Sequence, residues 1–198
     1  MKIIGLTGSI GMGKSFVARI FREQGIEVFD ADEVIHELTG KGGEAEKEVL
    51  SLFPDADDGQ GHIYRPKLGM MVFSDEDKLR ELEQLLHPMV KAKGDAFYQR
   101  CEAEGKKMIV QDIPLLFETG ADKSCHAVVV VSAPEELQTE RVLSREQMTA
   151  EKYEQIKEFQ LSNEEKIKRA DYVIYTDQDE EIIEEQVKEI IDKLQRVQ

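Results

Sequence analysis

The stretch that decides the fold is Gly8-Ser9-Ile10-Gly11-Met12-Gly13-Lys14-Ser15, which satisfies the pattern G-x-x-x-x-G-K-[ST]. Glycines let the backbone take positive φ angles and pass close to an anion, and N–H groups at the start of a helix point toward it. The apolar run Lys2–Thr7 precedes the stretch, and helical spacing follows it. This context distinguishes a phosphate-binding loop from a chance glycine turn, so the sequence predicts binding of a nucleoside triphosphate.

The side chains of this loop have predicted tasks. Lys14 is expected to reach the β- and γ-phosphates, and the hydroxyl of Ser15 is expected to bind Mg²⁺. The predicted nucleotide-binding residues are Gly8, Gly11, Met12, Gly13, Lys14, Ser15, Phe16 and, from a later helix, Arg145.

Outward from the loop, strands alternate with helices. Apolar runs predict further strands at 26–30, 107–113, 126–132 and 171–176, and four consecutive valines predict that the fourth strand is buried on both faces. Helical spacing covers 14–24, 135–145 and a final segment rich in isoleucine. A strand–helix–strand order implies parallel pairing, so we expect an α/β fold with an open five-stranded parallel sheet and helices on both faces.

Two long helical stretches interrupt this alternation. The first, from about 32 to 104, is predicted to be a helical lobe inserted between the second and third strands, and Pro88 is expected to end or kink one of its helices. The second, 149–169, is predicted as a polar helix without the apolar face of a core helix. Such a segment is typical of a lid that closes over a nucleotide.

The composition restricts the class of function. A net charge of −15 argues against a broad nucleic-acid surface, because neutralising a phosphate backbone needs clustered Lys and Arg. The apolar start is too short for a signal peptide or a membrane span, and the two cysteines show no metal-like spacing. We therefore expect a cytoplasmic protein that binds neither nucleic acid nor membranes.

Among proteins with such a loop, a small-molecule kinase fits best. A GTPase is disfavoured, because the only asparagine, Asn163, precedes Glu164 and cannot form the guanine-reading N-K-x-D motif. A kinase needs a carboxylate that orients the acceptor hydroxyl. Asp30 and Asp32 follow the second strand, at the sheet edge where ligands gather, although either could instead cap the next helix.

Charged residues elsewhere supply the remaining candidate groups. Arg141 and Arg145 lie four residues apart, on one face of the predicted helix. The two guanidinium groups could clamp phosphate oxygens, or they could form surface ion pairs with Glu140 or Glu146. Asp112 ends an apolar strand and is predicted either to hold Mg²⁺ or to cap a loop.

Taken together, these residues resemble the dephospho-CoA kinase family over nearly the whole chain. Besides the phosphate loop, the family's motifs match Asp30-Ala31-Asp32, G-x-I-x-R at 61–65, Leu86-His87-Pro88, Pro114-Leu115-Leu116-Phe117-Glu118, Arg141, Arg145, Gln160 and the segment 169–174. The loop alone is shared by many families, whereas the combination of these motifs is much more specific.

The resemblance implies transfer of the γ-phosphoryl group of ATP, with Mg²⁺, to the 3′-hydroxyl of dephospho-CoA, the last step of CoA synthesis. It implies Asp32 as base, Lys14 and Arg141 as charge stabilisers, and substrate contacts from Asp32, Arg65, His87, Pro114 and Leu115. A single monomeric kinase domain would then comprise a nucleotide-binding core (1–31, 105–140 and 170–198), a helical substrate lobe (32–104) and a lid (141–169).

Two alternatives stay open, and departures from the family pattern bear on one of them. The family often has Thr, Arg and Asn where this chain has Phe16, His36 and Thr176. The losses at His36 and Thr176 are the only support for a non-catalytic ATP-binding sensor. The other alternative is a kinase for a nucleoside or nucleotide, against which the P-L-L-F-E and H-P motifs argue.

Overall fold

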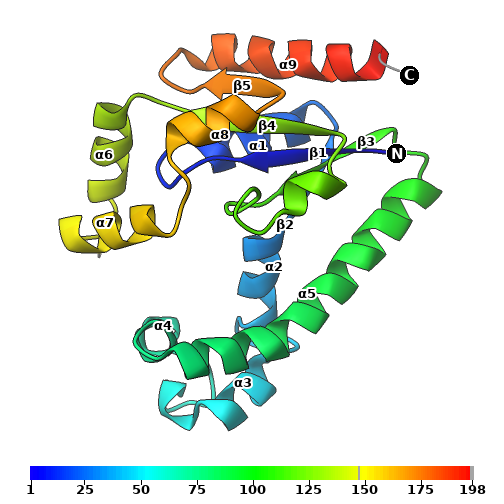
Figure 1. Cartoon of the computed structure of the whole chain (residues 1–198). Helices are drawn as coiled ribbons and strands as arrows, with labels where there is room; N and C mark the ends of the chain where they lie inside the picture. The colour runs from blue at the N-terminus through cyan, green and yellow to red at the C-terminus, as the bar shows by residue number, and fades with distance from the viewer. Residues whose placement is uncertain (147, 197–198) are drawn as a thin grey trace. The chain divides into compact units, whose positions relative to one another are not determined.

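In the computed structural model, a five-stranded sheet follows the order β2-β3-β1-β4-β5 (Figure 1). Strand β1 pairs in parallel with β3 and β4, and β4 pairs in parallel with β5. The strands are β1 (Lys2–Thr7), β2 (Glu27–Asp30), β3 (Met108–Asp112), β4 (Ala127–Ser132) and β5 (Tyr172–Tyr175). The predicted α/β class and the five strands are confirmed, and β4 is buried along its whole length as expected.

The structure describes residues 1–146 and 148–196, except for the side chain of Phe73. These residues divide into two units: Met1–Phe29 with Cys101–Gln198, and Asp30–Arg100. The predicted lid and core segments include positions 147, 197 and 198, which lie outside the described residues.

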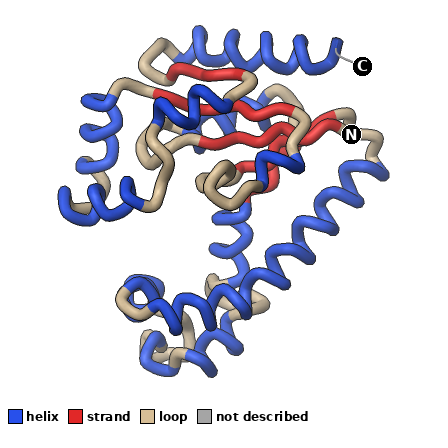
Figure 2. The backbone as a smooth tube through the Cα atoms, in the orientation of Figure 1, coloured by secondary structure: helices blue, strands red, loops and turns tan. Residues whose placement is uncertain are grey.

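Helices cover both faces of the sheet in the first unit (Figure 2). Because side chains alternate along a strand, Val129 and Val131 belong to the core cluster that includes α1 (Lys14–Glu23) and α9 (Glu180–Arg196). Val128 and Val130 belong to the opposite cluster, which includes Ile167 of α8 (Asn163–Arg169).

The prediction of one polar helix at 149–169 is wrong in two respects. It is divided into α7 (Ala150–Glu158) and α8, because the side chain of Ser162 accepts a hydrogen bond from the backbone N–H of Glu165 and caps a new helix. It also has buried faces, since Tyr153 is 2% exposed and α8 packs on β4.

The helix predicted at 135–145 is shorter than expected. Helix α6 (Glu135–Leu143) ends before Arg145, and the hydroxyl of Ser144 donates to the carbonyl of Arg141 at this end. The assumption that Arg141 and Arg145 share one helix face is therefore wrong.

The second unit is helical and has its own apolar core. Its elements are α2 (Ala31–Leu38), α3 (Glu46–Leu52), the short 3₁₀ turn η1 (Pro54–Ala56), α4 (Arg65–Phe73) and most of α5 (Glu76–Ala103). The buried side chains of this core are Leu38, Ala45, Val49, Phe53, Ala56, Leu68, Val72 and Leu86. A further 3₁₀ turn, η2 (Ala121–Ser124), belongs to the first unit.

Helix α5 continues through Pro88, so of the two alternatives expected for this proline the helix end is wrong, and the kink stays a prediction. A proline inside a helix removes one backbone hydrogen bond and costs about 3 kcal/mol. On both sides of it, Leu85, Leu86 and Met89 pack into the core of the second unit, which favours helix on either side of the defect. Across the described ranges, every helix is too short or too polar to cross a membrane.

Candidate active site

The loop between β1 and α1 has the backbone shape that the sequence predicts. Gly11 and Gly13 have φ angles of 80° and 90°, in the left-handed region that favours glycine. A Cβ atom on Gly11 would lie 2.5 Å from Cγ2 of Val142, so space as well as φ excludes a side chain there. Helix α1 begins at Lys14 without a side-chain cap and without an acidic residue in its first turn, which suits its start to an anion.

The sheet brings Asp112 to this loop. Asp112 is the last residue of β3 and lies opposite Leu6 in the register of β1. Its carboxylate is fully buried and forms an ion pair with the ammonium of Lys14, whose side chain is 15% exposed. Two predicted site residues, 98 positions apart, therefore lie together, and the ammonium is held at the loop by a fixed charge.

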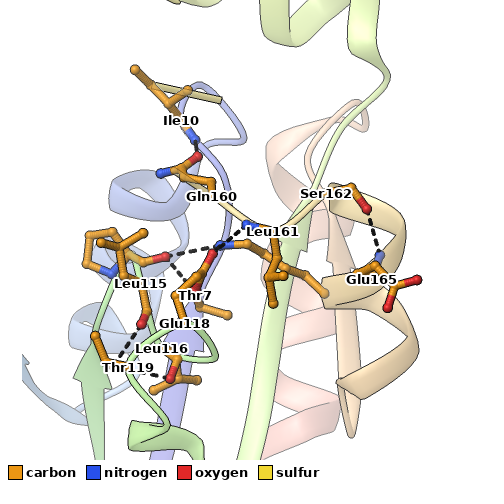
Figure 3. Close-up of polar contacts among 12 residues, drawn as sticks. Thr7, Ile10, Leu115, Leu116, Glu118, Thr119, Gln160, Leu161, Ser162 and Glu165 are labelled. Carbon is orange, nitrogen blue, oxygen red and sulfur yellow. Dashed lines mark hydrogen bonds and ion pairs between the residues drawn. The ribbon is translucent and has the colours of Figure 1, made fainter. Parts of the chain in front are cut away.

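Both backbone polar groups of Ile10 are occupied by side chains from other elements. The carbonyl accepts a 2.7 Å hydrogen bond from Nε2 of Gln138 on α6. The N–H donates at 3.1 Å to Oε1 of Gln160, which Figure 3 shows pointing at Ile10. The crest of the loop is therefore fixed in orientation.

Arg141 is tied to the other end of the loop. Its guanidinium donates to Oγ1 of Thr176 at 2.9 Å and to the carbonyl of Thr176 at 2.8 Å. The same hydroxyl donates to the carbonyl of Met12 at 2.7 Å. Thr176 thus joins the loop to Arg141, and the catalytic role of Arg141 stays a prediction.

The other predicted nucleotide-binding residues lie along the loop and beyond α6. Gly8 leaves no room for a side chain, because a Cβ atom would lie 2.8 Å from the carbonyl oxygen of Val131. Ser15 is exposed, and Phe16 is half-buried beneath the guanidinium of Arg19, 4.9 Å from the ring centroid. Arg145 is exposed just past the end of α6.

A cavity of about 410 Å³ opens beside the loop in the first unit, and its lining includes Ser9, Met12, Gln138, Lys157, Gln160 and Asn163. Cavities of this size accept small ligands or parts of larger ones. The carboxylates of Glu135 and Glu164 also line the cavity, and the ammonium of Lys157 lies 4.0 Å from Glu135. This mixture of amide, hydroxyl, ammonium and carboxylate groups suits a polar ligand.

The loop after β3 carries the predicted contacts Pro114 and Leu115. The carbonyl of Pro114 accepts hydrogen bonds from Oγ1 of Thr7 at 3.1 Å and from Nζ of Lys166 at 3.2 Å. Leu115 is 36% exposed. Pro114 is therefore tied to the strand that leads into the phosphate loop, and its side-chain contact with a substrate stays a prediction.

In the second unit, Asp30 is a helix cap. One oxygen of its carboxylate accepts hydrogen bonds from the N–H groups of Asp32 and Glu33, at 2.9 and 3.1 Å, at the start of α2. Asp32 lies exposed in the first turn. The cap interpretation of Asp30 is thereby favoured over the catalytic one, and Asp32 is left as the candidate base.

We expect Asp30→Ala to lower the free energy of unfolding by about 1 kcal/mol, the usual cost of losing a cap, and Asp30→Asn to lower it much less. Urea unfolding of the three proteins checks this. A turnover loss in Asp30→Asn as large as that in Asp32→Asn would instead make Asp30 the catalytic carboxylate.

The predicted substrate contacts of the second unit lie on α4 and α5. Arg65 begins α4, contacts Nδ1 of His36, and has a pKa lowered by burial. His36, which stands where the family often has Arg, therefore still offers a ring nitrogen that contacts Arg65 and helps to orient it. His87 is exposed on α5. Substrate binding by Arg65 and His87 stays a prediction.

Gln138 and Lys166 were not singled out by the sequence. Gln138 sits in a charged helix and Lys166 in a polar stretch, so local composition indicates exposed positions for both. In the structure they are 5% and 0% exposed. The burial of Lys166 arises only because α8 packs on β4. The residues next to Lys166 in the sequence, such as Ile167, do not indicate it.

Known proteins resemble this chain along nearly its whole length. The family model described as dephospho-CoA kinase matches residues 2–184. A dephospho-CoA kinase of Rhizobium meliloti is 44% identical over 194 residues, which cover 98% of each protein. Among solved structures, TT1252 from Thermus thermophilus has 34% identity and a TM-score of 0.83, covering 98% of this chain and 97% of that one.

A dephospho-CoA kinase from Campylobacter jejuni has 28% identity and a TM-score of 0.70, with 98% of each chain covered. The family match and the identity to the curated relative both span more than two thirds of the chain, and the phosphate loop has the shape that its motif requires. This chain belongs to the dephospho-CoA kinase family.

Proposed function

We propose that this chain transfers the γ-phosphoryl group of ATP to the 3′-hydroxyl of dephospho-CoA and so completes CoA. The observation that carries the proposal is the glycine loop with Lys14 held beside it by buried Asp112. Family membership over residues 2–184 supports the choice of acceptor.

The proposed chemistry assigns a task to each group. The 3′-oxygen forms a bond to the γ-phosphorus as the bond from that phosphorus to the β,γ-bridging oxygen breaks, and ADP leaves. Asp32 accepts the hydroxyl proton. Lys14 and Arg141 stabilise the negative charge on the transferring group, which is the main catalytic demand of phosphoryl transfer.

The oxygen donors at the loop suit Mg²⁺. Among the described residues there is no group of three or more His, Cys, Asp or Glu side chains placed to hold a metal. Mg²⁺ usually takes one or two protein oxygens and completes its shell with phosphates and water. We propose that the Ser15 hydroxyl holds the ion and that Asp112 contributes directly or through water. When bound, Mg²⁺ neutralises phosphate charge.

The larger parts of the chain have proposed roles as well. The helical segment 32–104 would bind dephospho-CoA with Arg65 and His87, while Pro114 and Leu115 contribute from the core. The segment 141–169 would act as the lid, anchored at its far end by α8. We further propose a cytoplasmic monomer, in keeping with a sequence that holds only two cysteines, Cys101 and Cys125. Light scattering of the purified protein tests the oligomeric state.

Purified protein, ATP, Mg²⁺ and dephospho-CoA test the function directly, with mass detection of CoA as the readout. We expect CoA and ADP in equal amounts. Turnover of nucleosides or nucleotides in place of dephospho-CoA would select the alternative kinase. Nucleotide binding with no transfer to any acceptor would select the sensor.

A further inference from the structure

The ammonium of Lys166 is buried in the first unit, although lysines are rarely buried unless they are paired. It lies 3.0 Å from Oε1 of Glu118, whose side chain is 15% exposed. Burial works to raise the pKa of Glu118, but hydrogen bonds from the N–H of Leu161 and from Lys166 outweigh it and hold that pKa below its ordinary value. The two residues therefore form a charged pair in the core.

A buried ion pair is weak evidence of stabilisation, because apolar residues of similar size often replace such a pair at little cost. The pair is also incompletely satisfied. Oε2 of Glu118 is buried and makes no hydrogen bond within the described part of the chain, whereas Oε1 accepts both from Lys166 and from the N–H of Leu161. The contacts of Oε1 thus favour a role in orientation.

The pair reaches the phosphate loop by two routes. Lys166 donates to the carbonyl of Pro114 at 3.2 Å, and Oγ1 of Thr7 donates to the same oxygen at 3.1 Å. Thr7 directly precedes the first glycine of the loop. This route fixes the start of the loop.

The second route runs through the end of the lid segment. Oε1 of Glu118 accepts a 2.7 Å hydrogen bond from the N–H of Leu161, and the preceding residue, Gln160, accepts the N–H of Ile10. Figure 3 shows Glu118, Leu161, Gln160 and Ile10 following one another along this path. This route fixes the crest of the loop.

We infer that Glu118 and Lys166 are positioning residues that hold Gln160 and Pro114 where these fix the phosphate loop in its nucleotide-binding shape. The pair couples the base of the lid segment to the loop, so that the lid's end cannot shift without releasing the amide of Ile10. This inference rests on the proposed nucleotide-dependent function, but it concerns binding of ATP rather than the choice of acceptor.

The test uses Lys166→Met, which keeps most of the length of the side chain and removes its charge, and Glu118→Gln, which keeps an acceptor for Leu161. The matched control is Lys168→Met on the same helix. Its ammonium lies 2.7 Å from Glu165, close to the 3.0 Å of the buried pair, but both side chains face solvent. Direct titration with ATP gives the dissociation constant, and thermal unfolding shows that each variant is folded.

Both buried-pair variants are expected to weaken ATP binding about ten- to a hundredfold, as losses of orienting partners do, while the KM for dephospho-CoA changes little. Lys168→Met is expected to bind ATP as the parent does. Hydrogen exchange at the amide of Ile10 should be faster in both variants, with exchange in α9 unchanged. If the variants show only a lower melting temperature, with parent-like ATP affinity and parent-like exchange at Ile10, the pair has a structural role alone and the inference is overturned.

A double-mutant cycle with Gln160→Ala makes the route itself testable. If the pair acts through Gln160, the effects of Lys166→Met and Gln160→Ala on the ATP dissociation constant are less than additive. Full additivity would contradict the route. Because the titration needs no acceptor, absence of CoA formation by the parent would reject the proposed function and leave this result interpretable.

Discussion

Replacing Asp32 with asparagine is expected to lower kcat by about a hundred- to ten-thousandfold, the usual contribution of a positioned general base. The ATP dissociation constant should change little, because the substitution leaves the phosphate loop intact and the N-cap of α2 is supplied by Asp30. Steady-state kinetics with dephospho-CoA and titration with ATP measure the two effects separately.

The control for this prediction is Glu33→Gln, which removes a neighbouring carboxylate from the same first turn of α2. It should retain most of the turnover, since only the carboxylate that meets the acceptor hydroxyl is needed. Turnover at the level of the parent in Asp32→Asn, or an equal loss of ATP affinity and turnover, would remove Asp32 from the role of base.

The second large effect is expected for Lys14→Ala, which should lower kcat by about a hundred- to a thousandfold, the range for loss of one group that stabilises developing charge. The affinity for ATP should also fall, because Lys14 is predicted to contact the β- and γ-phosphates in the ground state as well. Titration with ATP and kinetics at saturating dephospho-CoA measure both changes.

Lys14→Ala also leaves the carboxylate of Asp112 buried without its ion-pair partner, so a loss of stability has to be separated from a loss of function. The double variant Lys14→Ala with Asp112→Asn removes that uncompensated charge. It should recover much of the lost thermal stability and none of the ATP affinity. Parent-like ATP binding by either variant would contradict the phosphate-binding role of the loop.

The sequence predicted the sheet and the phosphate loop because their signals are local. A strand of six residues, a glycine turn and a helix start are read from neighbouring positions, and the positive φ angles of Gly11 and Gly13 confirm the turn. That Asp112 lies near Lys14 could also be expected from the sequence, because it follows from the order of strands and loops. Parallel strands end at one edge of a sheet, so a carboxylate at the end of β3 comes near the loop after β1.

Helix ends were predicted less well, because they depend on caps and packing rather than on periodicity. The break before α8 depends on one hydroxyl, that of Ser162, and the continuity of α5 through Pro88 depends on apolar contacts on both sides of the proline. Asp30 was ambiguous for a similar reason, since an aspartate after a strand can either cap a helix or serve a ligand.

By itself, then, the sequence determined the α/β sheet, the anion-binding turn and the family, because each is carried by residues adjacent along the chain or by motifs of fixed spacing. Only the tertiary structure decided how that turn is held. Gln138, Gln160 and Thr176 reach Ile10 and Met12 from 128 or more positions away, and Lys166 is buried beside Glu118. Such contacts form when α8 and β5 pack against β4 and when Gln138 of α6 reaches the loop. The polar composition of α6 and α8 gives no local sign of where their side chains will point.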